Sequence, residues 1–207
     1  MTKVKICGIT NIIEAQIAIN AGTWAIGEVF AHSKGQITPE AAARINYAVK
    51  YSPILKVGVF VNEDINELKY IAKNCLLDMV QLHGHEPPEY VEELDLPVIK
   101  AISVSSPTDI EKAYQYEAWA YLFDTKIDGL FGGTGLTFNW EWLTKFLSQR
   151  VILAGGLNPQ NVKEAIRIVR PMAVDVSSGV EFRYGGKDPQ KIMDFINSVK
   201  EADQLVS

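Results

Sequence analysis

The sequence predicts one closed barrel of eight parallel strands and eight helices, a (β/α)8 fold, over residues 1–207. Short apolar runs alternate with segments of helical period, the alternation repeats eight times, and glycine-rich turns follow the last three predicted strands. An open, doubly wound parallel sheet is the main alternative. The count of eight and the late glycine turns favour the closed, compact barrel.

The eight predicted strands are rich in β-branched and apolar residues. Such runs are expected where helices or barrel contents cover both faces of a parallel sheet. In chain order, the strands are predicted at residues 4–9, 24–30, 55–61, 79–82, 98–102, 120–123, 151–154 and 173–176.

The helices are predicted between and after these strands. They lie at residues 12–21, 39–49, 62–74, 88–94, 107–116, 140–147, 159–169 and 189–200. Several begin with a capping side chain or a proline near the first turn, at Thr38-Pro39, Asn62, Asn158-Pro159 and Asp188-Pro189.

Composition limits the partners. The chain is 47% hydrophobic with a formal net charge of -5, which suits one globular domain without internal boundaries. The acidity argues against nucleic acid, whose binding depends on Lys and Arg, and no apolar run approaches the roughly 18 residues of a membrane span. We expect a small-molecule partner, which local donors can hold even if it is anionic, and a monomer or homodimer.

The two cysteines, Cys7 and Cys75, cannot form a disulfide framework. The first residues do not resemble a secretory signal, so the expected compartment is the reducing cytoplasm. Cys75 lies in a predicted helix and is interpreted as a packing residue.

Reactive side chains collect at the carboxyl ends of the predicted strands, where (β/α)8 enzymes carry out chemistry. Cys7 ends the first strand directly before a glycine, and His83, Asp124 and Asp175 lie at the ends of the fourth, sixth and eighth. Read without any relative, Cys7 is also compatible with a small buried residue and Asp124 with a turn cap.

Glycine and hydroxyl residues follow strands six, seven and eight. Their backbone N–H groups can approach and hold a phosphate without a lysine, although glycines also serve tight turns alone. The candidate phosphate-binding residues are Gly133, Thr134, Gly135, Gly155, Gly156, Ser177, Ser178 and Gly179.

Six motifs occur in order: KVKICGIT (3–10), GVFVN (58–62), QLHG (81–84), FDT followed by GGTG (123–125, 132–135), AGGLNPQNV (154–162) and DVSSGVE (175–181). Together they resemble the phosphoribosylanthranilate isomerases over essentially the whole chain. The resemblance implies an intramolecular aldose–ketose isomerase that needs no cofactor or metal. Its reaction is the Amadori rearrangement of N-(5-phosphoribosyl)anthranilate to 1-(2-carboxyphenylamino)-1-deoxyribulose 5-phosphate, the third step of tryptophan biosynthesis from chorismate.

By this resemblance Cys7 is the general base and Asp124 the general acid. Cys7 needs a positive field, from Lys5 or the substrate iminium, to act as a thiolate near neutrality, and Asp124 needs burial to stay protonated. His83 is expected to border the substrate, and Asp175 to bond a sugar hydroxyl or to orient Cys7.

Two residues of the second βα unit depart from the family pattern. Gly35 stands where many members carry an arginine placed to pair with the anthranilate carboxylate, and Lys34 or Gln36 would compensate only partly. Glu28 puts a carboxylate in an apolar strand, where it either weakens the anthranilate side or faces an outer helix with a partner such as lysine.

Three other functions are considered beside this one, and the two departures favour the first of them. The first is a related or broadened phosphoribosyl-amine isomerase, and the second is a non-catalytic sugar-phosphate-binding barrel. A metal-dependent sugar-phosphate epimerase is disfavoured, because His32, His83 and His85 do not fall on separate strand ends.

Overall fold

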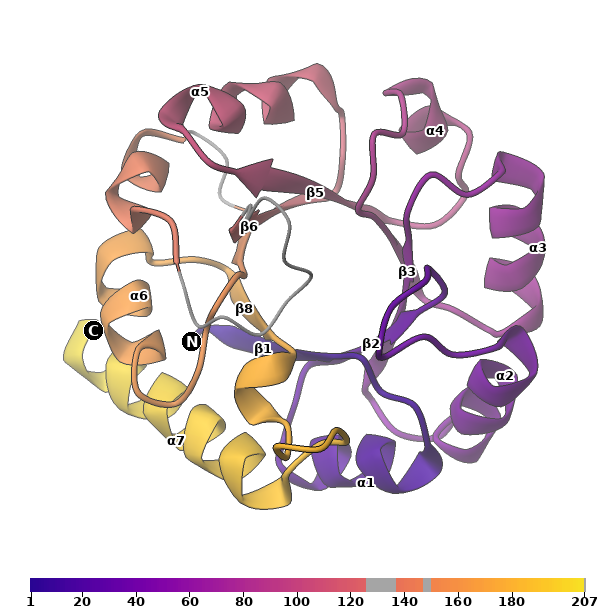
Figure 1. Cartoon of the computed structure of the whole chain (residues 1–207), viewed down its shortest axis with the longest axis horizontal. Coiled ribbons are helices and arrows are strands. Elements are labelled where there is room, and N and C mark those ends of the chain that lie inside the picture. Colours follow the sequence, from indigo (N-terminus) through magenta and orange to yellow (C-terminus); the bar gives the residue numbers. More distant parts are fainter. Residues whose placement is uncertain (126–136, 147–149, 207) are drawn as a thin grey trace.

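The computed structural model describes residues 1–125, 137–146 and 150–206. Its eight strands are all parallel and close into a barrel in sequence order, with the helices outside (Figure 1). The strands are β1 Lys3–Cys7, β2 Ala25–Val29, β3 Leu55–Phe60, β4 Met79–Leu82, β5 Val98–Val104, β6 Ala120–Thr125, β7 Val151–Leu153 and β8 Ala173–Val176. The predicted (β/α)8 barrel is therefore confirmed.

The outer layer mixes α-helices with short 3-10 helices. The α-helices are α1 Ile12–Asn20, α2 Pro39–Ala48, α3 Ile65–Asn74, α4 Glu89–Glu92, α5 Pro107–Ile110, α6 Val162–Val169 and α7 Pro189–Val206. The 3-10 helices are η1 Glu111–Gln115, η2 Trp140–Lys145 and η3 Ser178–Val180. None of the described helices is long and apolar enough to cross a membrane.

Several predicted helix boundaries were wrong. Asn62 does not begin a helix, because its φ of 52° is left-handed; α3 begins after Asp64, whose carboxylate accepts from the N–H groups of Asn66 and Glu67. The side chain of Asn158 caps a turn by accepting from the N–H groups of Gln160 and Asn161. The helix α6 therefore starts only at Val162.

Three other predicted helices are shorter or wound differently. The segment predicted at 88–94 is helical only over the four residues of α4, after which Leu94 packs against the core. The segment at 107–116 changes from α5 to the 3-10 helix η1. The segment predicted at 140–147 is the 3-10 helix η2 over Trp140–Lys145, and its first turn is capped by Asn139.

The alternation of side chains along each strand separates two cores. One fills the barrel and contains Ala25, Val57, Ile99, Leu122 and Ile152 among its members, and the other lies between the strands and the helices. The inner core closes the barrel below its carboxyl rim, so the polar strand ends face open space above a packed interior.

Candidate active site

Cys7, Asp124 and Asp175 lie on the carboxyl rim of the barrel, and His83 follows directly after β4. The closed parallel topology explains this, because every strand delivers its last residues to the same end. Cys7 and Asp175 are buried, whereas Asp124 and His83 are partly exposed at the rim.

A fully buried lysine, Lys5, lies next to the Cys7 thiol. Lys5 lies two residues before Cys7 on β1 and therefore points to the same side of the strand. Its Nζ pairs with Asp175 Oδ1 of the neighbouring strand β8 at 3.0 Å. Asp175 thus holds the lysine that stands beside the thiol.

Gly27 on β2 makes room for this arrangement. It is the register partner of Cys7, and a Cβ at position 27 would lie 2.8 Å from Cys7 Sγ and 3.0 Å from Lys5 Nζ. A side chain at position 27 would displace both groups. Nothing in the local sequence marks Gly27, because only the barrel register reveals the contact.

The electrostatic environment of Cys7 combines opposing effects. Burial raises the pKa of the thiol above its ordinary value of 9.0, while Lys5 and Lys187 lower it and Asp175 raises it. Burial dominates, so the positive field expected from Lys5 is present but does not by itself yield a thiolate. Burial lowers the pKa of Lys5, but Asp175 and Cys7 outweigh it and raise this pKa overall.

Asp124 and His83 face each other across the rim. His83 Nε2 lies 3.4 Å from Asp124 Oδ2, and Gln81 Nε2 lies 3.0 Å from His83 Nδ1. The Gln81 contact orients the His83 ring so that Nε2 faces Asp124. The Asp124–His83 contact was not predicted from the sequence.

The turns after β7 and β8 form a pair with free backbone donors. Among the described residues, no acceptor faces the N–H groups of Gly155, Gly156, Ser178 or Gly179. Gly155 has a φ of +83°, and a Cβ there would lie 2.7 Å from Asp124 Oδ1. A Cβ on Gly179 would lie 2.0 Å from the carbonyl oxygen of Leu157. A side chain at either position would therefore require the neighbouring atoms to move. Gly133, Thr134 and Gly135 lie outside the described residues.

Lys187 is another site residue that the sequence analysis missed. It is buried, and its Nζ contacts Glu181 Oε1 at 2.7 Å and the carbonyl and hydroxyl oxygens of Ser177 at 3.3 Å. Ser177 is therefore oriented by a lysine that also acts on Cys7.

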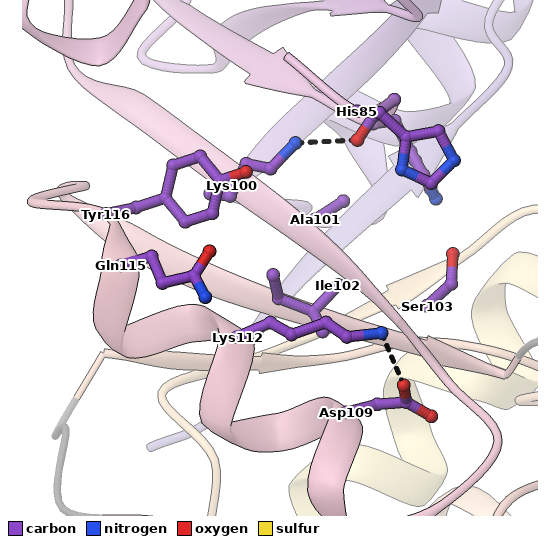
Figure 2. A pocket seen from close by; sticks show the side chains of 11 residues that line it. His85, Lys100, Ala101, Ile102, Ser103, Asp109, Lys112, Gln115 and Tyr116 are labelled. Atoms are coloured by element: carbon purple, nitrogen blue, oxygen red, sulfur yellow. Dashed lines mark hydrogen bonds and ion pairs between the residues drawn. The ribbon is translucent and has the colours of Figure 1, made fainter. Parts of the chain in front are cut away.

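A buried ion pair fixes the loop that carries His83. Lys100 Nζ on β5 bonds Glu86 Oε2 at 2.7 Å and the carbonyl of Gly84 at 2.8 Å, and Glu86 accepts from the N–H groups of Asn62 and Gly84. Figure 2 shows Lys100 reaching that loop along one wall of a cavity of about 420 Å³ beside β5. The loops after β3 and β4 are thereby tied to β5.

Glu28 does not belong to the site. It alternates with Gly27 along β2 and points outward, where its Oε2 accepts from Asn46 Nδ2 of α2 at 2.9 Å. The interpretation that it adds negative charge to the anthranilate side is wrong, and its partner is an asparagine rather than a lysine.

Gly35 does lie at the rim. A Cβ at this position would meet Gly8 Cα at 3.6 Å, which is ordinary van der Waals contact. Gln36 Nε2 donates to the carbonyl of Phe30, so its amide is engaged in shaping its own loop. Among the described residues, no cluster of three His, Cys, Asp or Glu side chains could hold a metal ion.

Comparison with known proteins agrees with this geometry. The family model for N-(5'-phosphoribosyl)anthranilate (PRA) isomerase matches residues 4–198. The chain belongs to this family. A PRA isomerase from Syntrophomonas wolfei is 52% identical over 97% of this chain and 98% of its own length.

Solved structures of the family show the same barrel. The crystal structure of the PRA isomerase from Thermotoga maritima has a TM-score of 0.90 and 44% identity, over 97% of this chain and all of that one. A PRA isomerase in complex with reduced 1-(o-carboxyphenylamino)-1-deoxyribulose 5-phosphate has a TM-score of 0.86 and 42% identity, with the same coverage.

Proposed function

We propose that this member of the PRA isomerase family isomerises N-(5'-phosphoribosyl)anthranilate, in tryptophan biosynthesis, with Asp124 as general acid and Cys7 as general base. The observation that carries the assignment is the placement of both residues on one rim, with Cys7 in the space that Gly27 leaves open and Asp124 facing His83. Their positions support two separate proton transfers to one bound substrate.

The first transfer opens the sugar ring. Protonated Asp124 gives its proton to the ring oxygen, the bond from that oxygen to C1 breaks, and the nitrogen lone pair forms the C1–N double bond of an iminium. His83 Nε2, at 3.4 Å, positions the carboxyl group, and the absence of a side chain at Gly155 leaves room for its other oxygen.

The second transfer moves a proton from carbon. Cys7, as thiolate, takes the C2 proton, and the electron pair forms the C1–C2 double bond while the iminium electrons return to nitrogen. The iminium charge supplements Lys5 and Lys187, which already lower the pKa of the thiol against the effect of burial. The enol then loses its hydroxyl proton and C1 gains one, giving the ketose.

The overall change is an internal oxidation and reduction, in which C1 is reduced and C2 is oxidised. The atoms and electrons balance within the substrate, so we infer an intramolecular oxidoreductase that requires no cofactor. Because Cys7 must remain a free thiol, we place the enzyme in the reducing cytoplasm.

The phosphate group is assigned to the turns after β7 and β8. Four backbone N–H groups, of Gly155, Gly156, Ser178 and Gly179, find no acceptor among the described residues. Free backbone donors on glycine turns can bind phosphate oxygens, and such binding would hold the sugar over Cys7 and Asp124.

Turnover of the substrate tests the proposal. The aminoaldose is generated in situ from anthranilate and phosphoribosyl pyrophosphate, and the loss of its fluorescence is followed with wild type, Asp124→Asn and the control Cys75→Ser. We expect turnover by wild type and Cys75→Ser and a fall in kcat of about 10² to 10⁴ for Asp124→Asn. An inert wild-type enzyme that still binds ribose 5-phosphate would indicate a non-catalytic barrel instead.

A further inference from the structure

A second cavity lies next to the end of β1, and none of the residues of the phosphate turns lines it. It has a volume of about 500 Å³ and lies between the loops after β1, β2 and β8. Gly8, directly after Cys7, forms part of its wall, and Gly35 and Arg183 belong to its lining. The cavity therefore begins one residue along the chain from Cys7.

The cavity carries more positive than negative charge, although the whole chain has a net charge of -5. Its lining includes the cations Lys34, Arg183 and Lys187 against the carboxylates Glu14 and Glu181. Both carboxylates are already used inside the fold. Glu181 pairs with Lys187 at 2.7 Å.

Glu14 is satisfied by the backbone and by a hydroxyl group. One of its oxygens accepts from the N–H and hydroxyl of Thr10, and the other accepts from the N–H of Lys187. Within the described ranges, Lys34 and Arg183 have no acidic partner. Two cations of the cavity are therefore available to an anionic ligand.

Arg183 is held at the tip of a short hairpin. Glu181 and Lys187 form an antiparallel bridge, the N–H of Phe182 donates to the carbonyl of Gly186 at 2.9 Å, and the N–H of Gly185 donates to the carbonyl of Phe182 at 3.1 Å. The Arg183 guanidinium lies 5.7 Å from the ring centroid of Tyr184. This closed turn presents Arg183 from a defined backbone rather than from a long loop.

We infer that Arg183, assisted by Lys34, binds the carboxylate of the substrate's aromatic ring and so determines specificity for a carboxylated arylamine. The inference rests on the proposed function, which places the phosphate at the turns after β7 and β8. With the reacting carbons at Cys7, the aromatic end of the substrate must extend away from those turns, and this cavity offers cations there.

On this inference, the guanidinium that pairs with the carboxylate comes from Arg183 in the loop after β8 and not from residue 35. Gly35 contributes no charge, and the Gln36 amide is bonded to Phe30, whereas a guanidinium provides two parallel donors for a carboxylate. The distance of 148 positions between residues 35 and 183 explains why local sequence patterns did not reveal the replacement.

The test separates carboxylate recognition from general damage. The variants are Arg183→Ala, Arg183→Lys, the double variant Arg183→Ala/Gly35→Arg, and the control Arg44→Ala on the exposed face of α2. Each is measured for steady-state kinetics, for calorimetric binding of reduced 1-(o-carboxyphenylamino)-1-deoxyribulose 5-phosphate, and for inhibition by ribose 5-phosphate, which lacks the carboxylate.

We expect Arg183→Ala to raise KM and the dissociation constant of the reduced compound about tenfold, with kcat changed less than about threefold. Inhibition by ribose 5-phosphate should be unchanged, as should all properties of Arg44→Ala. Arg183→Lys should bind with intermediate affinity. Gly35→Arg should restore binding in the double variant, because its Cβ has room over Gly8.

Two results would overturn the inference. One is unchanged binding of the reduced compound by Arg183→Ala; the other is an equal weakening of ribose 5-phosphate, which would indicate a structural role for the hairpin. If the wild-type enzyme fails to turn over, the proposed function fails, but the calorimetric titration still decides whether Arg183 binds the carboxylate.

Discussion

The most specific prediction about stability concerns the carboxyl group of Glu28. Its side chain is completely buried, and only Oε2 has a partner, the Nδ2 of Asn46 at 2.9 Å. Glu28 Oε1 and Asn46 Oδ1 both lack hydrogen-bond partners. A proton on Oε1 would supply a donor where two acceptors now stand unpaired, and burial raises the pKa of Glu28 to about 7.

The magnitude follows from linkage between protonation and folding. Between its ordinary pKa of 4.5 and about 7, Glu28 binds a proton in the folded protein but not in the unfolded chain. The stabilisation is therefore fully present below pH 4.5 and is lost as the pH rises through 7. At 1.36 kcal/mol for each pKa unit, the contribution amounts to about 3 kcal/mol.

Glu28→Gln removes this dependence while keeping the shape of the side chain. Urea unfolding of wild type and Glu28→Gln between pH 5 and pH 8 should show the variant gaining stability relative to wild type by about 2.5 kcal/mol, with equal m-values. Glu92→Gln, at an exposed position in α4, is the control and should show no such trend. A stability difference between wild type and Glu28→Gln that stays constant within about 0.5 kcal/mol over this range would refute the reasoning.

Three further substitutions probe the site and its support. Gly27→Ala would place a Cβ 2.8 Å from Cys7 Sγ, so kcat should fall about a hundredfold; a kcat within twofold of wild type would contradict this packing. Lys5→Met removes a cation that lowers the pKa of Cys7, so the pH profile of Cys7 alkylation by iodoacetamide should move to higher pH rather than stay unchanged. Lys100→Met leaves Glu86 buried without its cation and should lower the free energy of unfolding by about 3 to 5 kcal/mol in urea titrations; a loss under 1 kcal/mol would argue against a structural role for the pair.

The sequence predicted the strands well because each carries its own apolar signal. The helices were harder, since α5 continues as the 3-10 helix η1 and α3 begins at Asp64 instead of Asn62. Such boundaries depend on which side chain reaches a free N–H group, and that choice is made by the tertiary structure. The outward direction of Glu28, by contrast, follows from simple alternation with Gly27.

The residues of the candidate site likewise differ in how well the sequence pattern reveals them. Cys7 and Asp124 were identifiable because the ends of parallel strands share one rim. Lys187 and Gly27 were not, because their contacts are with residues distant along the chain, and the role proposed for Arg183 depends on a cavity that only the fold forms. The Glu86–Lys100 pair likewise joins two loops and a strand without any motif that marks it.

The turnover of Cys7→Ser tests the central claim most directly. A hydroxyl in place of the thiol keeps the size and hydrogen bonding of the side chain but is a far weaker acid and does not form a useful base at neutral pH. We predict that kcat falls by about 10² to 10⁴, while the calorimetric dissociation constant for reduced 1-(o-carboxyphenylamino)-1-deoxyribulose 5-phosphate stays within about threefold of wild type. A Cys7→Ser enzyme that retains kcat within tenfold would show that another group removes the C2 proton.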